Sequence, residues 1–261
     1  MDKKCPEALN VIIHEFLCIH EYGMVIFHRK YQPQEDSTDI ILRSGLISAL
    51  YNFATETEKD SIDFLRMEKV QLFFKKHDLL LFVLFIDSSI NPNLVKICEG
   101  TFDLLQKTFF KRFPEVQWQK EIIDLCKFES FNKDADRILA ALGKKLNLLQ
   151  FLNDDGLLLE EDLLESEIGI LGAKVGTKLL ERNHDQLVHA LTQNPEYALM
   201  EVDKILAYLD AEHIERSDKQ FTLHCDKCYI CDEIKSDCFF NDFLITLFSP
   251  LNLNLQIIKK S

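Results

Sequence analysis

The sequence EYGMVIFHRKY (residues 21–31), followed by DIILRSGLISALYNFATE (residues 39–56), decides how the first half of this 261-residue chain folds. Gly23 separates two apolar, β-prone segments, residues 9–19 and 24–31. A tight turn at this point needs a positive φ, which glycine adopts readily. Residues 37–39 are Ser, Thr and Asp, which are all suitable N-caps. The sequence therefore predicts a β-hairpin followed by a helix over residues 40–55.

The predicted helix carries an apolar side and a small polar stripe. The apolar side consists of Leu42, Leu46, Leu50 and Phe53, and the polar stripe of Ser44, Ser48, Asn52 and Thr55. Two interpretations stay open. In the first, the helix packs tightly on its own sheet through Ser44, Gly45, Ser48 and Ala49. In the second, the helix and the neighbouring strand edge form a contact face for another protein.

The pattern after this helix completes an α+β domain. Three short apolar segments, residues 61–66, 69–74 and 79–86, are separated by polar turns and predict strands. Asn91-Pro92 begins a long helix, which ends at Arg112-Phe113-Pro114. A last helix is expected over residues 133–142, ending at Gly143. The predicted order is two strands, a helix, three strands and two helices, with all five strands in one antiparallel sheet.

This order resembles the longin fold of membrane-trafficking proteins over about residues 8–143. The resemblance is carried by EYGMVIFHRKY, DIILRSGLISALYNFATE and the strand LLLFVLFID (residues 79–87). It implies that the helix over residues 40–55 and its strand edge contact a small GTPase or a second subunit. The exposed edges of the sheet also require pairing or cover, so we expect a homodimer or a hetero-oligomer.

The second half predicts a mostly helical α+β domain with a small antiparallel sheet. Gly169, Gly172 and Gly176 recur at helical spacing, and a further helix is expected over residues 199–209. A strand begins at Phe221, a helix covers residues 238–248, and residues 251–257 alternate as a closing strand. We place the boundary after residue 146, which gives one domain over residues 1–146 and a second over residues 147–261. The acidic segment 153–167 is expected to be a packed amphipathic helix.

This second half resembles the 4-vinyl-reductase type of domain, which also occurs in TRAPP tethering subunits. The family places a Cys-x-x-Cys after a strand and another cysteine before an apolar helix, and Cys228, Cys231 and Cys238 fit those positions. The family's glycine in the following helix is replaced here by Asn241 or Asp242. The resemblance implies either a tether-like subunit or a sensor for a small apolar ligand.

Four cysteines lie close together in the sequence: Cys225, Cys228, Cys231 and Cys238. Zinc takes four thiolates in a tetrahedron, and cysteines two residues apart can hold it from one turn. We expect at least three of these thiols to bind one zinc ion. The alternatives are an iron–sulfur or redox role, and thiols that bind no metal.

Other features exclude several function classes. The net charge of −13 gives no basic footprint for nucleic acid. Neither a Gly-x-Ser-x-Gly elbow nor a His-Glu-x-x-His pair occurs, and GAKVGTK (residues 172–178) lacks the order of a phosphate loop. No apolar run is long enough for a transmembrane helix or a signal peptide. We expect a cytoplasmic protein without enzymatic activity, with membrane contact only at the periphery.

Together these features predict a non-enzymatic adaptor or regulator that resembles trafficking-tether subunits and acts through a small GTPase or related adaptor subunits. The alternative is a sensor of a small apolar ligand with a zinc-stabilised C-terminal domain.

Overall fold

The computed structural model divides into two compact units, residues 1–91 with 99–143 and residues 92–98 with 144–261. The structure describes residues 12–32, 39–57, 61–97, 99–114, 125–159, 162, 168–182, 214–217, 220–225, 239–248 and 254–259.

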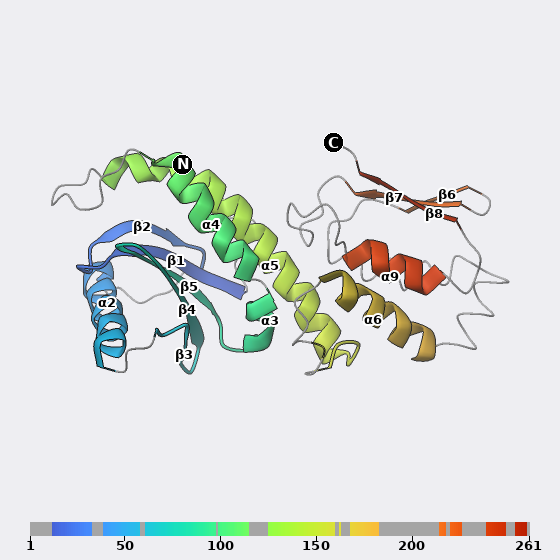
Figure 1. Ribbon diagram of the computed structural model, residues 1–261, viewed down its shortest axis with the longest axis horizontal. Coiled ribbons are helices and arrows are strands. Elements are labelled where there is room, and N and C mark those ends of the chain that lie inside the picture. The colour runs from blue at the N-terminus through green and yellow to red at the C-terminus, as the bar shows by residue number, and fades with distance from the viewer. Residues whose placement is uncertain are drawn as a thin grey trace. The chain divides into compact units, whose positions relative to one another are not determined.

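The first unit is built on a five-stranded antiparallel sheet (Figure 1). Its strands are β1 (Ile13–His20), β2 (Val25–Lys30), β3 (Phe64–Arg66), β4 (Val70–His77) and β5 (Leu80–Asp87), in the spatial order β2-β1-β5-β4-β3. Helix α2 (Ile40–Thr57) connects β2 to β3. The predicted α+β class, the five antiparallel strands and the helix between the second and third strands are therefore confirmed.

The two faces of this sheet are covered by different helices. Helix α2 lies on one face, where Leu17, Val83 and Phe85 belong to the same buried cluster as its Ile47 and Tyr51. Helix α4 (Glu99–Arg112), the short 3-10 helix η1 (Leu125–Phe131) and the first part of α5 (Asn132–Asp154), up to residue 143, lie on the other. The strands therefore bury both faces, which explains the near-continuous apolar run of β5.

The face under α4 is filled by phenylalanine rings. Phe109 of α4 contacts Phe82 of β5 at a centroid distance of 5.7 Å, and Phe131 of η1 contacts Phe27 of β2 at 5.2 Å. These rings are offset or edge-on, the arrangements that aromatic pairs prefer. Outside the core, the Arg29 guanidinium donates to both oxygens of Asp136 at 2.8 and 2.7 Å, which fixes α5 beside β2.

The helix expected from Asn91-Pro92 to Arg112 is described as α3 (Pro92–Ile97) and α4, and residue 98 between them lies outside the described residues. Two other sequence predictions about the helices were wrong over the residues that the structure describes. Gly143 does not end a helix, because α5 continues to Asp154, with Leu146, Leu149 and Leu152 fully buried. Burial of this apolar side outweighs the modest intrinsic cost of one helical glycine. Within the acidic segment 153–167, residues 155–159 form a turn, where Gly156 adopts a positive φ of 67°, and not the expected helix. Residues 160–161 and 163–167 lie outside the described residues.

The second unit contains α6 (Ile168–Arg182), β6 (Ile214–Ser217), β7 (Gln220–Cys225), α9 (Phe239–Phe248) and β8 (Asn254–Lys259). Helix α9 packs on α6 and contacts β8 (Figure 1). Residues 172–178 lie inside α6, so they form a helix face and not a phosphate loop. The helix expected over residues 199–209 falls outside the described residues.

The small sheet of the second unit is mixed, and this corrects one detail of the prediction. Strands β6 and β7 pair antiparallel, as expected, whereas β8 pairs with β7 in parallel. The chain between β7 and β8 contains α9, and parallel neighbours require a crossover of about this length. Alternation in the closing strand indicates burial on one side and says nothing about strand direction.

Candidate functional site

The candidate site is built around α2, whose inner side is fixed to the β1–β2 turn. Ser44 Oγ donates to the carbonyl oxygen of Gly23 at 2.9 Å, and Ser48 Oγ donates to that of Glu21 at 2.8 Å. Gly23 has a φ of +82°, and a Cβ at this position would lie 3.2 Å from the Cα of Gly45. Ser44 and Ser48 therefore hold the helix against the turn, as the first interpretation predicts for these two residues. Ala49 is exposed and does not take part in this contact.

A buried ion pair fixes the same side of α2. Glu15 of β1 is only 2% exposed. Its carboxylate accepts a hydrogen bond from Arg43 of α2, and the Nε2 atom of His28 lies 2.7 Å from the same oxygen. The Arg43 guanidinium also lies 5.3 Å from the ring centre of Phe85, a favourable cation–π contact. Arg43 is thus engaged inward, although it belongs to a helix whose other side is open.

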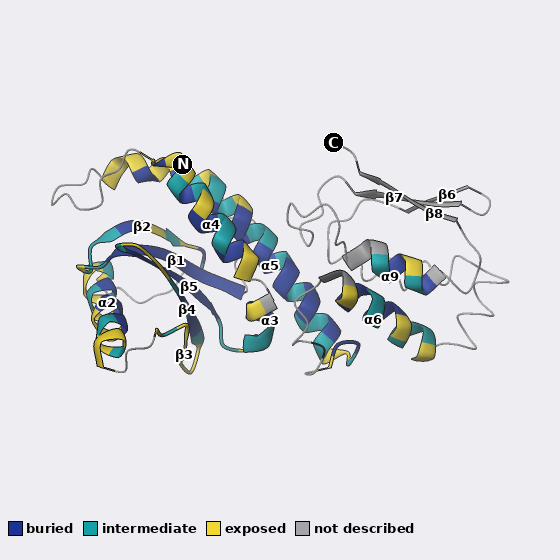
Figure 2. Ribbon diagram, viewed as in Figure 1, coloured by how far each residue is buried: buried dark blue, intermediate teal, exposed yellow. Residues whose placement is uncertain are grey.

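The outer side of α2 is apolar and exposed (Figure 2). The exposed fractions are 71% for Leu42 and Leu46, 65% for Phe53 and 38% for Leu50. Ala49 is also exposed between them. We call these five residues the α2 face. Arg43 and Glu56 are the charged residues of this 18-residue helix, and neither belongs to the α2 face, which therefore carries no charge.

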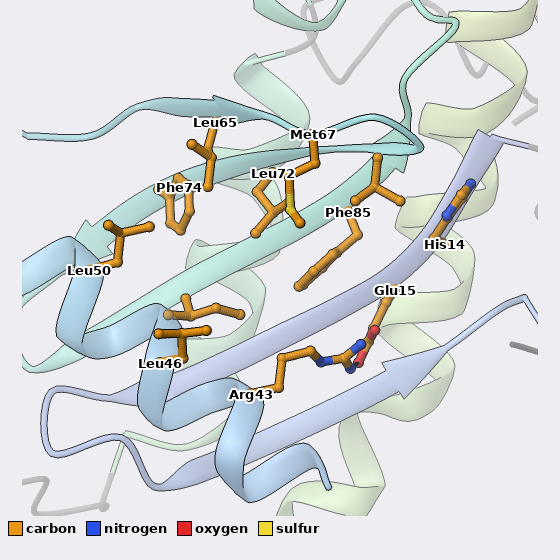
Figure 3. A pocket seen from close by; sticks show the side chains of 12 residues that line it. His14, Glu15, Arg43, Leu46, Leu50, Leu65, Met67, Leu72, Phe74 and Phe85 are labelled. Atoms are coloured by element: carbon orange, nitrogen blue, oxygen red, sulfur yellow. Dashed lines mark hydrogen bonds and ion pairs between the residues drawn. The ribbon is translucent and has the colours of Figure 1, made fainter. Parts of the chain in front are cut away.

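A groove of about 440 Å³ lies beside the α2 face. Leu46 and Leu50 form its helix side, Leu65 and Met67 come from the β3 side, and Leu72, Phe74 and Phe85 lie on the sheet (Figure 3). Ile47, Val70, His14, Glu15 and Arg43 complete the lining. We call this the α2 groove. Nearly all of its lining is apolar, which suits an apolar anchor from another molecule.

One end of the α2 groove is polar. His14 Nε2 lies 3.3 Å from Asp87 Oδ2, and the backbone N–H of Ser89 donates to Asp87 Oδ1 at 2.8 Å. Partial burial favours the neutral acid, but the hydrogen bonds from Ser89 and His14 outweigh it and lower the pKa of Asp87. Asp87 is therefore ionised at neutral pH and fixes the ring of His14.

The predicted cysteine site lies mostly outside the described residues. Cys225 is the last residue of β7, while Cys228, Cys231 and Cys238 fall outside the described ranges. Among the described residues, no group of three or more His, Cys, Asp and Glu could hold a metal ion. Within those same ranges, no helix is both long and apolar enough to cross a membrane.

The sequence placed Leu42, Leu46, Leu50 and Phe53 on one side of the helix and left open whether the helix contacts another protein, and it did not predict the groove. The groove needs Leu65 and Met67 beside α2, and only the pairing of β3 with β4 brings them there. The buried Glu15 was also missed. A charged residue inside an apolar strand is a usable signal, because a buried carboxylate needs a partner.

Comparisons with known proteins give weak structural likeness. No protein-family model and no curated protein matches the chain. The gliding protein MglB from Thermus thermophilus is 14% identical with a TM-score of 0.28, covering 53% of this chain and 84% of that one. MglB in a tetrameric arrangement is 15% identical with a TM-score of 0.28, covering 54% and 85%. A homology model of the full-length AP-3 complex is 16% identical with a TM-score of 0.33, covering 55% and 98%.

Proposed function

We propose that this chain is a non-enzymatic adaptor or regulator that acts by binding other proteins through the α2 face and the α2 groove. The observation that carries this proposal is the uncharged α2 face, whose large apolar side chains stay exposed on a helix anchored from its other side. Contiguous apolar surface of this kind on a soluble domain marks an interaction site. The groove beside it supplies a pocket for an apolar anchor, the usual centre of a protein interface.

The partner class follows from the longin and TRAPP-like resemblances of the two halves. They point to small GTPases and related adaptor subunits as the proteins to test. The observed order of strands and helices in the first unit agrees with what the longin resemblance implies.

The test uses the full chain and a panel of purified small GTPases, each loaded with GDP or with a non-hydrolysable GTP analogue. Biolayer interferometry should detect binding to at least one nucleotide state. Leu46→Glu places a charge in the α2 face and should weaken that binding by at least about tenfold. Leu125→Glu is the matched control, because Leu125 is an exposed leucine of η1 away from α2. Equal binding by the wild-type chain and Leu46→Glu would contradict the proposed surface.

A further inference from the structure

We propose that this chain docks on an anionic membrane surface through the outer side of α4, η1 and the first part of α5. These elements cover the sheet face opposite α2 (Figure 1). The first unit then rests on the membrane with one side and presents the α2 face to other proteins with the opposite side. This inference goes beyond the proposed function and does not depend on it, because it concerns different residues.

Five exposed basic residues lie on these three elements. Lys107 and Lys111 lie about one turn apart on α4, Lys133 and Arg137 lie about one turn apart on α5, and Lys127 belongs to η1. We call these five residues the basic side. Within the part of the chain that the structure describes, none of the five forms an ion pair. Their charges are therefore available to another molecule.

Helical spacing directs these charges away from the sheet. Leu105 and Phe109 of α4 and Ala135 of α5 are fully buried. Each basic residue of the two helices lies two positions from one of these buried residues, which is about 200° around the helix axis. The buried residues therefore face the core, and the basic residues of both helices face outward.

Most acidic residues of the same elements are already paired. Ion pairs join Asp103 to Lys75, Asp134 to Arg112 and Asp136 to Arg29. Among the described residues 99–143, Glu99 and Glu129 are the exposed acidic residues outside such pairs. Five unpaired positive charges thus stand against two negative ones, on a chain whose net charge is −13. This asymmetry orients the chain with its basic side toward an anionic surface.

The residue types favour a lipid surface over an acidic protein. Four of the five basic residues are lysines, which are depleted at protein interfaces. A lysine is a flexible point charge, which suits lipid headgroups without a fixed arrangement. Leu125 of η1 is 42% exposed, and it is the one exposed large apolar residue on the described part of α4, η1 and α5. A single leucine among lysines can enter the headgroup region but cannot form the apolar centre of a protein interface.

The acidic residues on the α2 side of the sheet do not prevent this docking. Helix α4 and the sheet lie between that side and the membrane, and a helix layer alone is about 10 Å thick. The Debye length is about 10 Å at 0.1 M salt. Repulsion from the far side is therefore largely screened, whereas the basic side acts at contact distance.

The experiment measures the partition constant of the full chain on sucrose-loaded vesicles by sedimentation. We expect binding to phosphatidylcholine vesicles that contain about 30 mol% phosphatidylserine, and none to phosphatidylcholine alone. Raising the salt from about 0.1 M to about 0.5 M should release the chain, because the Debye length becomes shorter. No binding to the phosphatidylserine vesicles, or equal binding to both kinds of vesicle, would overturn the inference.

Paired charge variants test whether the basic side makes the contact. Lys111→Gln with Lys133→Gln removes one charge from each helix and should lower the partition constant by at least about tenfold. The matched control is Lys69→Gln with Lys76→Gln, which removes two exposed lysines outside the three elements and should bind like the wild-type chain. Glu129→Lys should strengthen binding. An equal loss in both double variants would mean that total charge governs binding and would overturn the inference.

Crossed variants separate this inference from the proposed function. Leu125→Glu should weaken vesicle binding by at least about tenfold and leave GTPase binding unchanged, whereas Leu46→Glu should do the reverse. A chain that binds a GTPase and no anionic vesicle would retain the proposed function and exclude membrane docking. A chain that binds anionic vesicles through the basic side and no GTPase would retain membrane docking and exclude that partner class.

Discussion

Two glycine-bearing helices of this protein differ in how their glycines are used. In α6, a Cβ on Gly176 would lie 2.9 Å from the carbonyl oxygen of Phe243 and 3.1 Å from Cβ of Thr246, both in α9. In α2, a Cβ on Gly45 would meet nothing within 4 Å. The close approach that Gly176 allows is made within the chain, whereas the space outside Gly45 is empty.

The comparison shows what small residues at helical spacing can and cannot indicate. They indicate that a helix offers a surface for close approach, and both helices have such a surface. They do not indicate whether the approaching element belongs to the same chain. That distinction comes from the neighbours: α9 covers the α6 glycine, while five exposed apolar side chains surround the open side of the α2 glycine.

The largest expected effect is the loss of stability when a cysteine between β7 and α9 is changed. A zinc ion bound by these cysteines would add metal–thiolate bonds to the internal contacts of the second unit. We expect elemental analysis of protein purified without chelator to find about one zinc per chain. Because bound zinc contributes directly to folding, Cys228→Ser should lower the melting temperature far more than Cys5→Ser. A zinc content near zero, with all four thiols titrating freely in the folded protein, would leave Cys225, Cys228, Cys231 and Cys238 without a metal role.

The second-largest expected effect tests whether the ion pair between Glu15 and Arg43 fixes the inner side of α2 in the chain alone. Glu15→Leu leaves Arg43 without its carboxylate beneath the helix and should lower the free energy of unfolding by about 3 kcal/mol. Urea unfolding followed by circular dichroism measures the change. Glu56→Gln, which changes an exposed carboxylate of the same helix, should unfold like the wild-type chain. Equal stability of Glu15→Leu and Glu56→Gln would mean that this ion pair does not hold α2.

Charged residues also fix helix α6, through Asp162 with Lys174 and Lys178, whereas the α2 face has no charged residue. Asp162 accepts hydrogen bonds from Lys178 at 2.6 Å and from the Leu159 N–H at 2.9 Å. Burial opposes its ionisation, but these bonds and the Lys174 ammonium lower its pKa from 3.8 to about 2. A lowered carboxyl pKa gives stability that is present above about pH 4 and is lost as the pH falls toward 2.

This difference in pKa corresponds to about 2 kcal/mol at neutral pH. Asp162→Asn should lose that amount at pH 7 and show a smaller loss of stability between about pH 4 and pH 2.5 than the wild-type chain. Glu181→Gln, which changes an exposed residue of the same helix, serves as the control. An unchanged dependence of stability on pH for Asp162→Asn would mean that this charge cluster does not stabilise the protein.

The smallest expected effect is a change in the free energy of unfolding that has opposite signs for a glycine of α6 and a glycine of α2. Gly176→Ala forces α6 away from α9 and should lower the free energy of unfolding by about 1–2 kcal/mol. Gly45→Ala should raise it by up to about 1 kcal/mol, because alanine favours the helix and meets open space. Both variants are measured by urea unfolding followed by circular dichroism. A change of the same sign in both variants would mean that Gly176 and Gly45 do not differ in the space around them.

The sequence predicted the first unit well where local signals agreed with the tertiary contacts. Gly23 and the Ser44–Ser48 stripe predicted a turn and a helix, and the structure joins them by hydrogen bonds. Gly143 misled the prediction, because the buried leucines of α5 outweigh one glycine. The α2 groove could not be predicted, since it depends on residues brought to α2 by strand pairing.

The most direct test of the account is a methyl NMR titration of the isotope-labelled full chain with a small GTPase that it binds. We predict that the methyl signals of Leu46 and Leu50 in the α2 face change far more than those of Leu125, the exposed leucine of η1. Signal changes confined to residues away from α2 would contradict the claim that the α2 face is the protein-binding surface.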